Sequence, residues 1–287
     1  MRRTASTVAV VLFLLGGGLA KADPGADDRE ASVSTQMGER EITIRAEKVA
    51  PGIFFLHSGA GGNMALCIGE DGAFLVDDQY APLTDAIRQV IGQLTDEPVR
   101  FVLNTHWHGD HTGGIRGLLG AYPGTPVYGP ANERIPAISE QLGEGDRIRP
   151  PGLEQALQVL DVPGHTAGHI AYLADGTLLC GDTLFAGGCG RLFEGTPEQM
   201  HRSLSKLAGL APATRVCCAH EYTEANLLFA REVEPGDAES LVADRQLGEP
   251  LDLDQIAPLL ALVLVVEPCD AAAELVKLQL VLRGLVS

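Results

Sequence analysis

Four side chains that can bind metal ions stand between positions 106 and 111 of the chain: His106, His108, Asp110 and His111. They directly follow an apolar run at residues 99–103, which we expect to form a buried strand. At this spacing the first two histidines would point the same way, and the other two ligands would lie beyond a turn at Gly109. One metal ion cannot readily bind all four side chains, whereas two ions a few ångströms apart can. Imidazole suits zinc and related ions, and carboxylate suits the harder ion of such a pair.

Three further potential ligands each follow a later apolar run. His165 comes after residues 156–162, Asp182 after residues 178–180, and His220 after residues 216–219. Because a rigid sheet presents the side chains at its strand ends to one edge, we expect all seven ligands to meet there. The expected ligands are His106, His108 and His165 for one ion, Asp110, His111 and His220 for the other, and Asp182 as a bridge. Such a set leaves room for a shared water, which is typical of a catalytic site.

This arrangement predicts hydrolysis by a metal-bound hydroxide. Two ions would lower the pKa of a bridging water toward ~7, so that hydroxide exists at neutral pH. Asp110 is the expected catalytic residue, because it would both bind an ion and orient that hydroxide. The ions would polarise the substrate carbonyl and stabilise the oxyanion that forms. We expect two divalent ions per chain, with zinc as the first choice and iron or manganese as alternatives.

Three other side chains near these runs are expected to play supporting parts. Asp77 follows the apolar run at residues 73–76 and is expected to hold a ligand histidine in place. His169 and His57 are more typical of structural histidines than of ligands. None of the six cysteines stands in a setting that suggests a nucleophile, and their pairing stays open.

The elements that must position these ligands follow from the apolar pattern. Short apolar runs separated by turn residues predict strands, and the periodicity of three or four residues predicts helices. The expected strands are near residues 42–44 and at 53–56, 65–68, 73–76, 99–103, 127–128, 156–162, 170–173, 178–180 and 216–219. The expected helices are at residues 82–94, 115–119 and 197–207. Hairpins mixed with strand–helix–strand units predict a layered α/β protein with helices outside and sheet inside.

The two ends of the chain differ from this region. Residues 1–22 have a basic start, a short apolar run and the triplet Ala20-Lys21-Ala22, which together are typical of a secretory signal peptide. Residues 23–40 are small and polar and are expected to be a linker, residues 41–235 the hydrolase domain, and residues 236–287 an atypical extension. The signal predicts a periplasmic or secreted protein, or a cytoplasmic one if the signal is not used. No apolar run reaches the ~18 residues of a membrane span, so we expect no stable membrane insertion after cleavage.

The composition excludes several classes of protein. Hydrophobic residues make up 45% and charged residues 21%, which is ordinary for a globular protein. The formal net charge of −17 would repel phosphate backbones, so we do not expect a nucleic acid as partner. Six cysteines are too few for a disulfide scaffold of this length. The partner expected from the hydrolytic site described above is a small molecule, a thioester or an ester.

The ligand pattern resembles the metallo-β-lactamase fold superfamily. It is most similar there to glyoxalase II, the hydroxyacylglutathione hydrolases, between about residues 125 and 235. The motifs that carry this similarity are Pro163-Gly164-His165-Thr166, Gly181-Asp182-Thr183-Leu184-Phe185, Gly188-Cys189-Gly190-Arg191, Phe193-Glu194-Gly195 and His220-Glu221-Tyr222-Thr223. The resemblance implies an αββα sandwich with the metals at the sheet edge, followed by a short C-terminal helical extension. It also implies hydrolysis of thioesters of the S-2-hydroxyacylglutathione type, such as S-lactoylglutathione.

The same resemblance implies that Arg191, Phe193 and Tyr222 contact the substrate, with Phe193 standing where a tyrosine is common. The N-terminal half is more similar to secreted hydrolases of the superfamily, through Gly61-Gly62-Asn63 and Leu75-Val76-Asp77-Asp78. A secreted lactonase or β-lactamase-like hydrolase is therefore one alternative. A persulfide dioxygenase that uses a single iron is the other, and metal content distinguishes it from a two-metal hydrolase. The acyl group, the thiol and the oligomeric state stay open.

Overall fold

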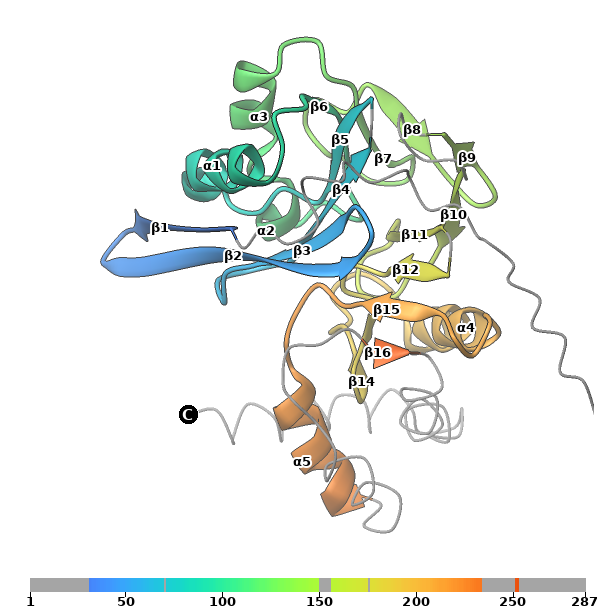
Figure 1. Ribbon diagram of the computed structural model, residues 1–287. Helices are drawn as coiled ribbons and strands as arrows, with labels where there is room; N and C mark the ends of the chain where they lie inside the picture. Colours follow the sequence, from blue (N-terminus) through green and yellow to red (C-terminus); the bar gives the residue numbers. More distant parts are fainter. Residues whose placement is uncertain (1–30, 70, 150–155, 175, 234–250, 253–287) are drawn as a thin grey trace, which may run out of the picture.

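The computed structural model describes residues 31–69, 71–149, 156–174, 176–233 and 251–252 (Figure 1). The predicted signal peptide at residues 1–22 lies outside these residues. Of the predicted C-terminal extension, only Leu251 and Asp252 are described. In the described part of the chain, the helices are all too short or too polar to cross a membrane.

The first sheet has eight strands that lie side by side in the order of the sequence. They are β1 (Ala31–Met37), β2 (Arg40–Ala50), β3 (Ile53–His57), β4 (Met64–Gly69), β5 (Gly72–Val76), β6 (Val99–Leu103), β7 (Val127–Pro130) and β8 (Glu140–Leu142). Pairing is antiparallel from β1 to β5 and parallel from β5 to β8. Parallel neighbours need a crossover between them, and helices supply the crossovers after β5 and β6.

The second sheet has six strands in the order β16-β15-β12-β11-β10-β9. They are β9 (Arg147–Ile148), β10 (Leu157–Asp161), β11 (Ile170–Ala174), β12 (Thr177–Leu179), β15 (Arg215–Cys217) and β16 (Leu251–Asp252). Strands β13 (Leu184–Phe185) and β14 (Gly188–Cys189) form a separate small hairpin.

Helices cover the outer faces of both sheets. The short 3-10 helix η1 (Ala81–Leu83), α1 (Thr84–Leu94) and α3 (Ile115–Ala121) pack on the first sheet, and α4 (Pro197–Ala208) packs on the second. Figure 1 shows α1 and α3 on one side of the paired sheets and α4 on the other. Side chains of alternate residues separate into the layers: Leu75 faces the helices, whereas Phe74 and Val76 face the second sheet. The predicted αββα sandwich is confirmed.

One predicted boundary is wrong. Residues 31–40, expected to belong to a linker, form β1 and the turn into β2. Every second residue of β1 is at least partly buried, from Ala31 to Met37, but its buried residues are mostly small or polar and hide the strand in the sequence. Gly38 makes the turn with a φ of 65°. Two other helices, α2 (Gly109–Thr112) and α5 (Thr223–Val233), are not among the predicted elements.

The sandwich brings five strand ends to one edge. Strands β5 and β6 run parallel, so Asp77 and His106 emerge together from the first sheet. In the second sheet β10, β12 and β15 run in one direction, so the segments that follow them also emerge together. These segments carry His165, Asp182 and His220. The hydroxyl of Tyr172 joins the two sheets at this edge by donating a hydrogen bond to the carbonyl of Asn104, at 2.8 Å.

Candidate metal centre

The segment after β6 is fixed by a buried asparagine before the histidines begin. The Nδ2 of Asn104 donates to Oδ2 of Asp78 at 2.8 Å and to the carbonyl of His111 at 2.9 Å. Gly109 was predicted to form a turn. It is instead the first residue of α2, and His108 precedes the helix. This short helix carries Asp110 and His111, and it places the His111 ring 4.1 Å from the His106 ring, measured between centroids.

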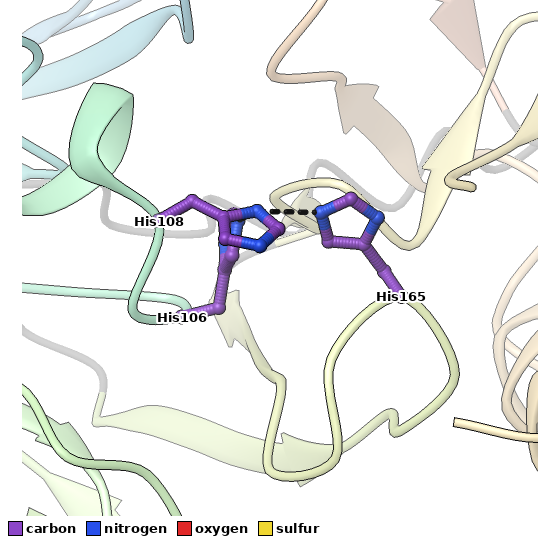
Figure 2. Close-up of side chains that lie close together, drawn as sticks. All are labelled: His106, His108 and His165. Carbon is purple, nitrogen blue, oxygen red and sulfur yellow. Dashed lines mark hydrogen bonds between the residues drawn. The ribbon is translucent and has the colours of Figure 1, made fainter. Parts of the chain in front are cut away.

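Three ring nitrogens converge beside this segment, as predicted for the first ion (Figure 2). The Nδ1 of His108 lies 3.1 Å from Nε2 of His106 and 3.0 Å from Nε2 of His165. The Nδ1 of His165 donates to the carbonyl of Arg191 at 2.7 Å, which leaves the lone pair of its Nε2 facing the other rings. Burial lowers the pKa of His106 well below its ordinary value and that of His165 to about 4. Both rings are therefore neutral near pH 7, and this is the form that binds a metal.

A second group lies next to the first, around His111. Its Nδ1 contacts Oδ2 of Asp77 at 2.8 Å, and its Nε2 lies 3.9 Å from Oδ2 of Asp110. The Nε2 of His220 lies 3.5 Å from the same Asp110 oxygen. Burial alone would lower the pKa of His111, but the carboxylates of Asp77 and Asp182 outweigh it and raise the pKa to about 9. A metal at this position must therefore displace a proton.

Asp182 stands between the two groups and turns one oxygen to each. Its Oδ1 lies 3.5 Å from Nε2 of His111 and 3.3 Å from Nε2 of His220. Its Oδ2 lies 3.3 Å from Nε2 of His165 in the first group. Burial opposes ionisation, but the surrounding imidazoles outweigh it and hold the pKa of Asp182 well below its ordinary value. This is the geometry expected of a carboxylate that bridges two cations.

The side chains present fit metal ions. The Nε2 of His111 and the Oδ1 of Asp182 are among the few buried side-chain atoms of the described residues that lack a hydrogen-bond partner. Leaving such atoms unsatisfied costs about 1–3 kcal/mol each. The candidate ligand atoms of each group lie within 4.8 Å of one another. A tetrahedral shell with bonds of about 2.0–2.1 Å places neighbouring ligand atoms about 3.3–3.4 Å apart, which is close to the separations around Asp182.

The two less certain histidines stand outside the candidate metal groups of the described residues. His169 is fully buried, and its Nε2 accepts a hydrogen bond from the backbone N–H of Asp182 at 3.1 Å. It therefore holds the backbone of Asp182 in place. His57 pairs with Glu47 across β2 and β3 at 3.0 Å.

The three residues implied as substrate contacts border both groups. The Phe193 ring is 56% exposed, and its centroid lies 5.1 Å from that of His108 and 5.3 Å from that of His165. The guanidinium of Arg191 lies 4.9 Å over the Phe193 ring. On the other side, the Tyr222 ring stacks on His220 at 5.4 Å.

A buried glutamine and two glycines near the site are not among the predicted site residues. The Nε2 of Gln79 donates to the carbonyl of Gly62 at 2.5 Å, and its Oε1 accepts from the backbone N–H of Tyr80 at 3.0 Å. A Cβ at Gly62 would stand 2.6 Å from Cε1 of His111, so only glycine lets the backbone pass this ring. The adjacent glycines are visible in the sequence, but their glutamine partner stands 17 residues away in the chain.

Glu133 was also not predicted, and it supports the loop that carries His165. Its Oε1 accepts hydrogen bonds from the hydroxyl of Thr166 and from the backbone N–H of Gly168, the latter at 3.2 Å. Burial raises the pKa of Glu133 to about 7, against the opposing effect of these hydrogen bonds. Its distance from the loop along the chain, 33 residues to Thr166, explains why no local pattern indicates it.

Comparison with known proteins gives a family, similar curated proteins and similar solved structures. Residues 59–220 match the family described as the Metallo-beta-lactamase superfamily. The chain is 61% identical over 155 residues to a hydroxyacylglutathione hydrolase of Alkalilimnicola ehrlichii, which covers 52% of this chain and 60% of that protein. It is 59% identical over 150 residues to the hydroxyacylglutathione hydrolase of Cupriavidus taiwanensis, which covers 48% of this chain and 56% of that protein. The chain thus spans about three fifths of the length of the curated relatives it matches.

A solved structure supports the fold. The metallo-beta-lactamase from Erythrobacter litoralis superimposes with a TM-score of 0.56 at 18% sequence identity, covering 80% of this chain and 99% of that one. At this identity the likeness concerns the arrangement of the layers and not the reaction.

Proposed function

Since the chain belongs to the metallo-beta-lactamase superfamily, we propose that it is a dinuclear-metal hydrolase of thioesters of the S-2-hydroxyacylglutathione type, with S-lactoylglutathione as the representative substrate. The observation that carries the proposal is the position of Asp182, which turns one carboxylate oxygen to each group of ligands. The hydroxyacylglutathione hydrolases similar to this chain support the choice of a glutathione thioester.

We assign the ligands to two ions of the same site. One ion takes His106, His108 and His165, the other takes Asp110, His111 and His220, and Asp182 bridges them. Zinc is the proposed metal, because it accepts both imidazole and carboxylate ligands in small shells. When bound, two such cations make hydroxide available near neutral pH and stabilise negative charge on an oxygen.

The residues around the site determine how water would be oriented and which leaving group is favoured. Asp110 is 20% exposed at its side chain and lines the cavity beside the site, where its carboxylate would orient the attacking water. Among the described residues, the histidines that meet at the centre are proposed metal ligands, apart from His169, whose Nε2 accepts from the backbone of Asp182, so they are not available to protonate a leaving group. A thiol with a pKa of about 8.5 leaves as thiolate without such help, whereas an amide nitrogen does not. The site therefore favours a thioester.

Arg191 is the proposed contact for the thiol half of the substrate. Glutathione carries carboxylates, and a guanidinium binds carboxylates with charge-assisted hydrogen bonds. The Arg191 guanidinium lies over the Phe193 ring, and that ring packs against the ring of His165, a proposed ligand of the first ion. We also propose, from the basic and apolar start of the chain, that the protein is exported to the periplasm or secreted.

Metal content and substrate preference together test this function. The purified protein is expected to contain close to two zinc ions per chain and to hydrolyse S-lactoylglutathione faster than a lactone or a β-lactam at equal concentration. Chelation should abolish the activity. One iron per chain with no thioester hydrolysis would indicate an oxygenase, and a lactone or β-lactam that turns over ten times faster would indicate another hydrolase of the superfamily.

A further inference from the structure

A cavity of about 530 Å³ opens beside the second group of ligands, on the side away from Arg191. We call it the aromatic pocket. Its principal lining side chains are Phe55, His57, Tyr80, Asp110, Glu221 and Tyr222. They come from the end of β3, the segment after β5, the start of α2 and the residues before α5. The candidate centre therefore has two flanks: this pocket beside Asp110 and His220, and the Arg191–Phe193 pair beside His108 and His165.

The wall nearest the centre is built by close packing around Gly61. A Cβ at this position would stand 2.7 Å from Cε2 of Tyr80 and 2.8 Å from Cβ of Asp110. Gly61 has a φ of 81°, which glycine adopts without strain. The backbone thus passes between the tyrosine ring and the aspartate, held there by the buried Gln79. The Tyr80 ring therefore packs against Gly61 and forms the wall of the pocket next to Asp110.

The charges of the pocket exclude a carboxylate. Among the described residues that line it there is no lysine or arginine, whereas Asp110 and Glu221 both line it. Arg45 stands opposite His57 in the strand register but does not line the pocket, and His57 is paired with Glu47 at 3.0 Å. A carboxylate placed beside Glu221, away from the second ion that Asp110 and His220 would hold, would lose its hydration without gaining a lysine or arginine as partner.

An uncharged aromatic group, by contrast, suits the side chains that line the pocket. Phe55, Tyr80 and Tyr222 offer ring faces and edges, against which another ring packs favourably. The volume is also within the range of about 300–1,000 Å³ that is typical of pockets for drug-sized ligands. A three-carbon lactoyl group leaves most of that space empty.

We propose, on the basis of the thioester hydrolysis proposed above, that the aromatic pocket takes the acyl half of the substrate and selects an uncharged aromatic 2-hydroxyacyl group. The carboxylates of the thiol half then lie against Arg191 on the other flank. Tyr80 is the specificity-determining residue for ring size, and Glu221 is the one for charge.

The first test compares two glutathione thioesters on the full-length, metal-loaded protein. The kcat/KM of S-mandeloylglutathione should exceed that of S-lactoylglutathione, and Tyr80→Ala should lower this ratio by about three- to tenfold. Tyr80→Phe keeps the ring and should keep the ratio. Phe193→Ala is the matched control, because it removes an exposed aromatic ring from the opposite flank and should change both substrates alike. An unchanged ratio in Tyr80→Ala, or an equal fall in Phe193→Ala, overturns the assignment of the pocket.

The second test concerns charge. S-succinylglutathione carries a carboxylate on its acyl group and should be a poor substrate of the unaltered protein. Glu221→Lys should raise its kcat/KM relative to S-lactoylglutathione by about tenfold. Glu224→Lys makes the same change three residues further on, at a position that is exposed like Glu221 but does not line the pocket, and should leave the ratio within about twofold, since solvent screens the more distant charge. Equal effects of the two variants contradict the proposal.

A binding measurement separates this inference from the proposed function. Mandelamide is an uncharged aromatic 2-hydroxyacyl amide without thioester or glutathione, and its binding to the metal-loaded protein can be followed by ligand-observed NMR. Binding that is lost in Tyr80→Ala and kept in Phe193→Ala supports the pocket even if S-lactoylglutathione is not hydrolysed. Hydrolysis of S-lactoylglutathione together with equal mandelamide binding by all variants supports the function and overturns the pocket.

Discussion

Asp77 sets the protonation of a proposed ligand, and replacing it with asparagine should remove one metal ion. Its Oδ2 accepts a hydrogen bond from Nδ1 of His111 at 2.8 Å, so Nε2 is the nitrogen that faces Asp110 and Asp182 and that offers its lone pair once a metal displaces its proton. An asparagine can still accept from the backbone N–H of Thr105, which lies 2.9 Å from Oδ1. Its amide group would then face Nδ1 of His111 with a donor instead of an acceptor. The ring must move its proton to Nε2 to accept that hydrogen bond, and Nε2 can then no longer bind a metal.

The expected loss of metal affinity follows from the hydrogen bond between Asp77 and His111. Changing a carboxylate that orients a ligand histidine typically costs 10–100-fold in metal affinity or activity, and a complete change of tautomer belongs at about the upper end. Asparagine is also the substitution that disturbs the backbone least. Asp77 has a φ of 60°, and asparagine shares with aspartate the ability to adopt this conformation.

The assay measures metal occupancy and tautomer together. Dialysis against buffered zinc followed by elemental analysis gives the affinity of the weaker site, which should fall by about 100-fold in Asp77→Asn while the other ion stays bound. Imidazole ¹⁵N spectra of the metal-free variant should show a proton on Nε2 of His111. Asp78→Asn is the matched control, because the neighbouring carboxyl is bonded to Asn104 and Gly114 and to no histidine ring. Two tightly bound ions in Asp77→Asn, or a proton that stays on Nδ1, would refute the reasoning.

Three other changes test separate parts of the site. Asp182→Ala removes the proposed bridge, so we expect release of both ions in elemental analysis and a loss of at least ~100-fold in thioester hydrolysis. Glu133 has a pKa raised from 4.5 to about 7, so its contribution to stability is present below pH 4.5 and is lost as the pH rises through about 7. Denaturant unfolding should therefore show Glu133→Gln gaining on the order of 2 kcal/mol over the unaltered protein between pH 4.5 and 8, and the exposed Glu140→Gln showing no such gain. Arg191→Ala should raise KM for S-lactoylglutathione with kcat nearly unchanged, by a factor that shrinks in high salt, whereas a fall in kcat alone would place Arg191 elsewhere in the reaction.

The parts of the fold predictable from the sequence are those with a long or continuous apolar signal. Strand β6 matches the predicted run of residues 99–103, because its side chains are buried on both faces and nearly all are apolar. Helix α1 follows from apolar residues spaced three and four apart, and these are the residues that it buries. Strands β8, β9, β13 and β14 have only two or three residues each, which is too short for any period to show.

The meeting of the candidate ligands could be predicted because each follows a strand, whereas several residues around them could not. His165, Asp182 and His220 belong to strands of one direction, so the sheet itself brings them together. Tyr80 and Glu133 reach the site through contacts across the fold, and nothing next to them in the chain indicates a partner. A single sequence shows that a metal-binding residue type follows a predicted strand. It does not show a pocket wall such as Tyr80 or a supporting residue such as Glu133, because these contacts form only when the two sheets have packed.

The segment from Asp77 to Tyr80 links the second group of candidate ligands to the aromatic pocket. Both Asp77 and Gln79 have a left-handed φ, of 60° and 63°, and such residues cost of order 1–3 kcal/mol each. Their hydrogen bonds to Thr105, His111 and Gly62 offset that cost. The left-handed backbone at these two residues directs Asp77 toward His111, a proposed ligand of the second ion, and places Tyr80 against Gly61 in the pocket wall. Since one strained segment holds both, a substitution that relaxes its backbone should weaken the second ion and loosen the acyl preference together, whereas Tyr80→Ala should change the acyl preference alone.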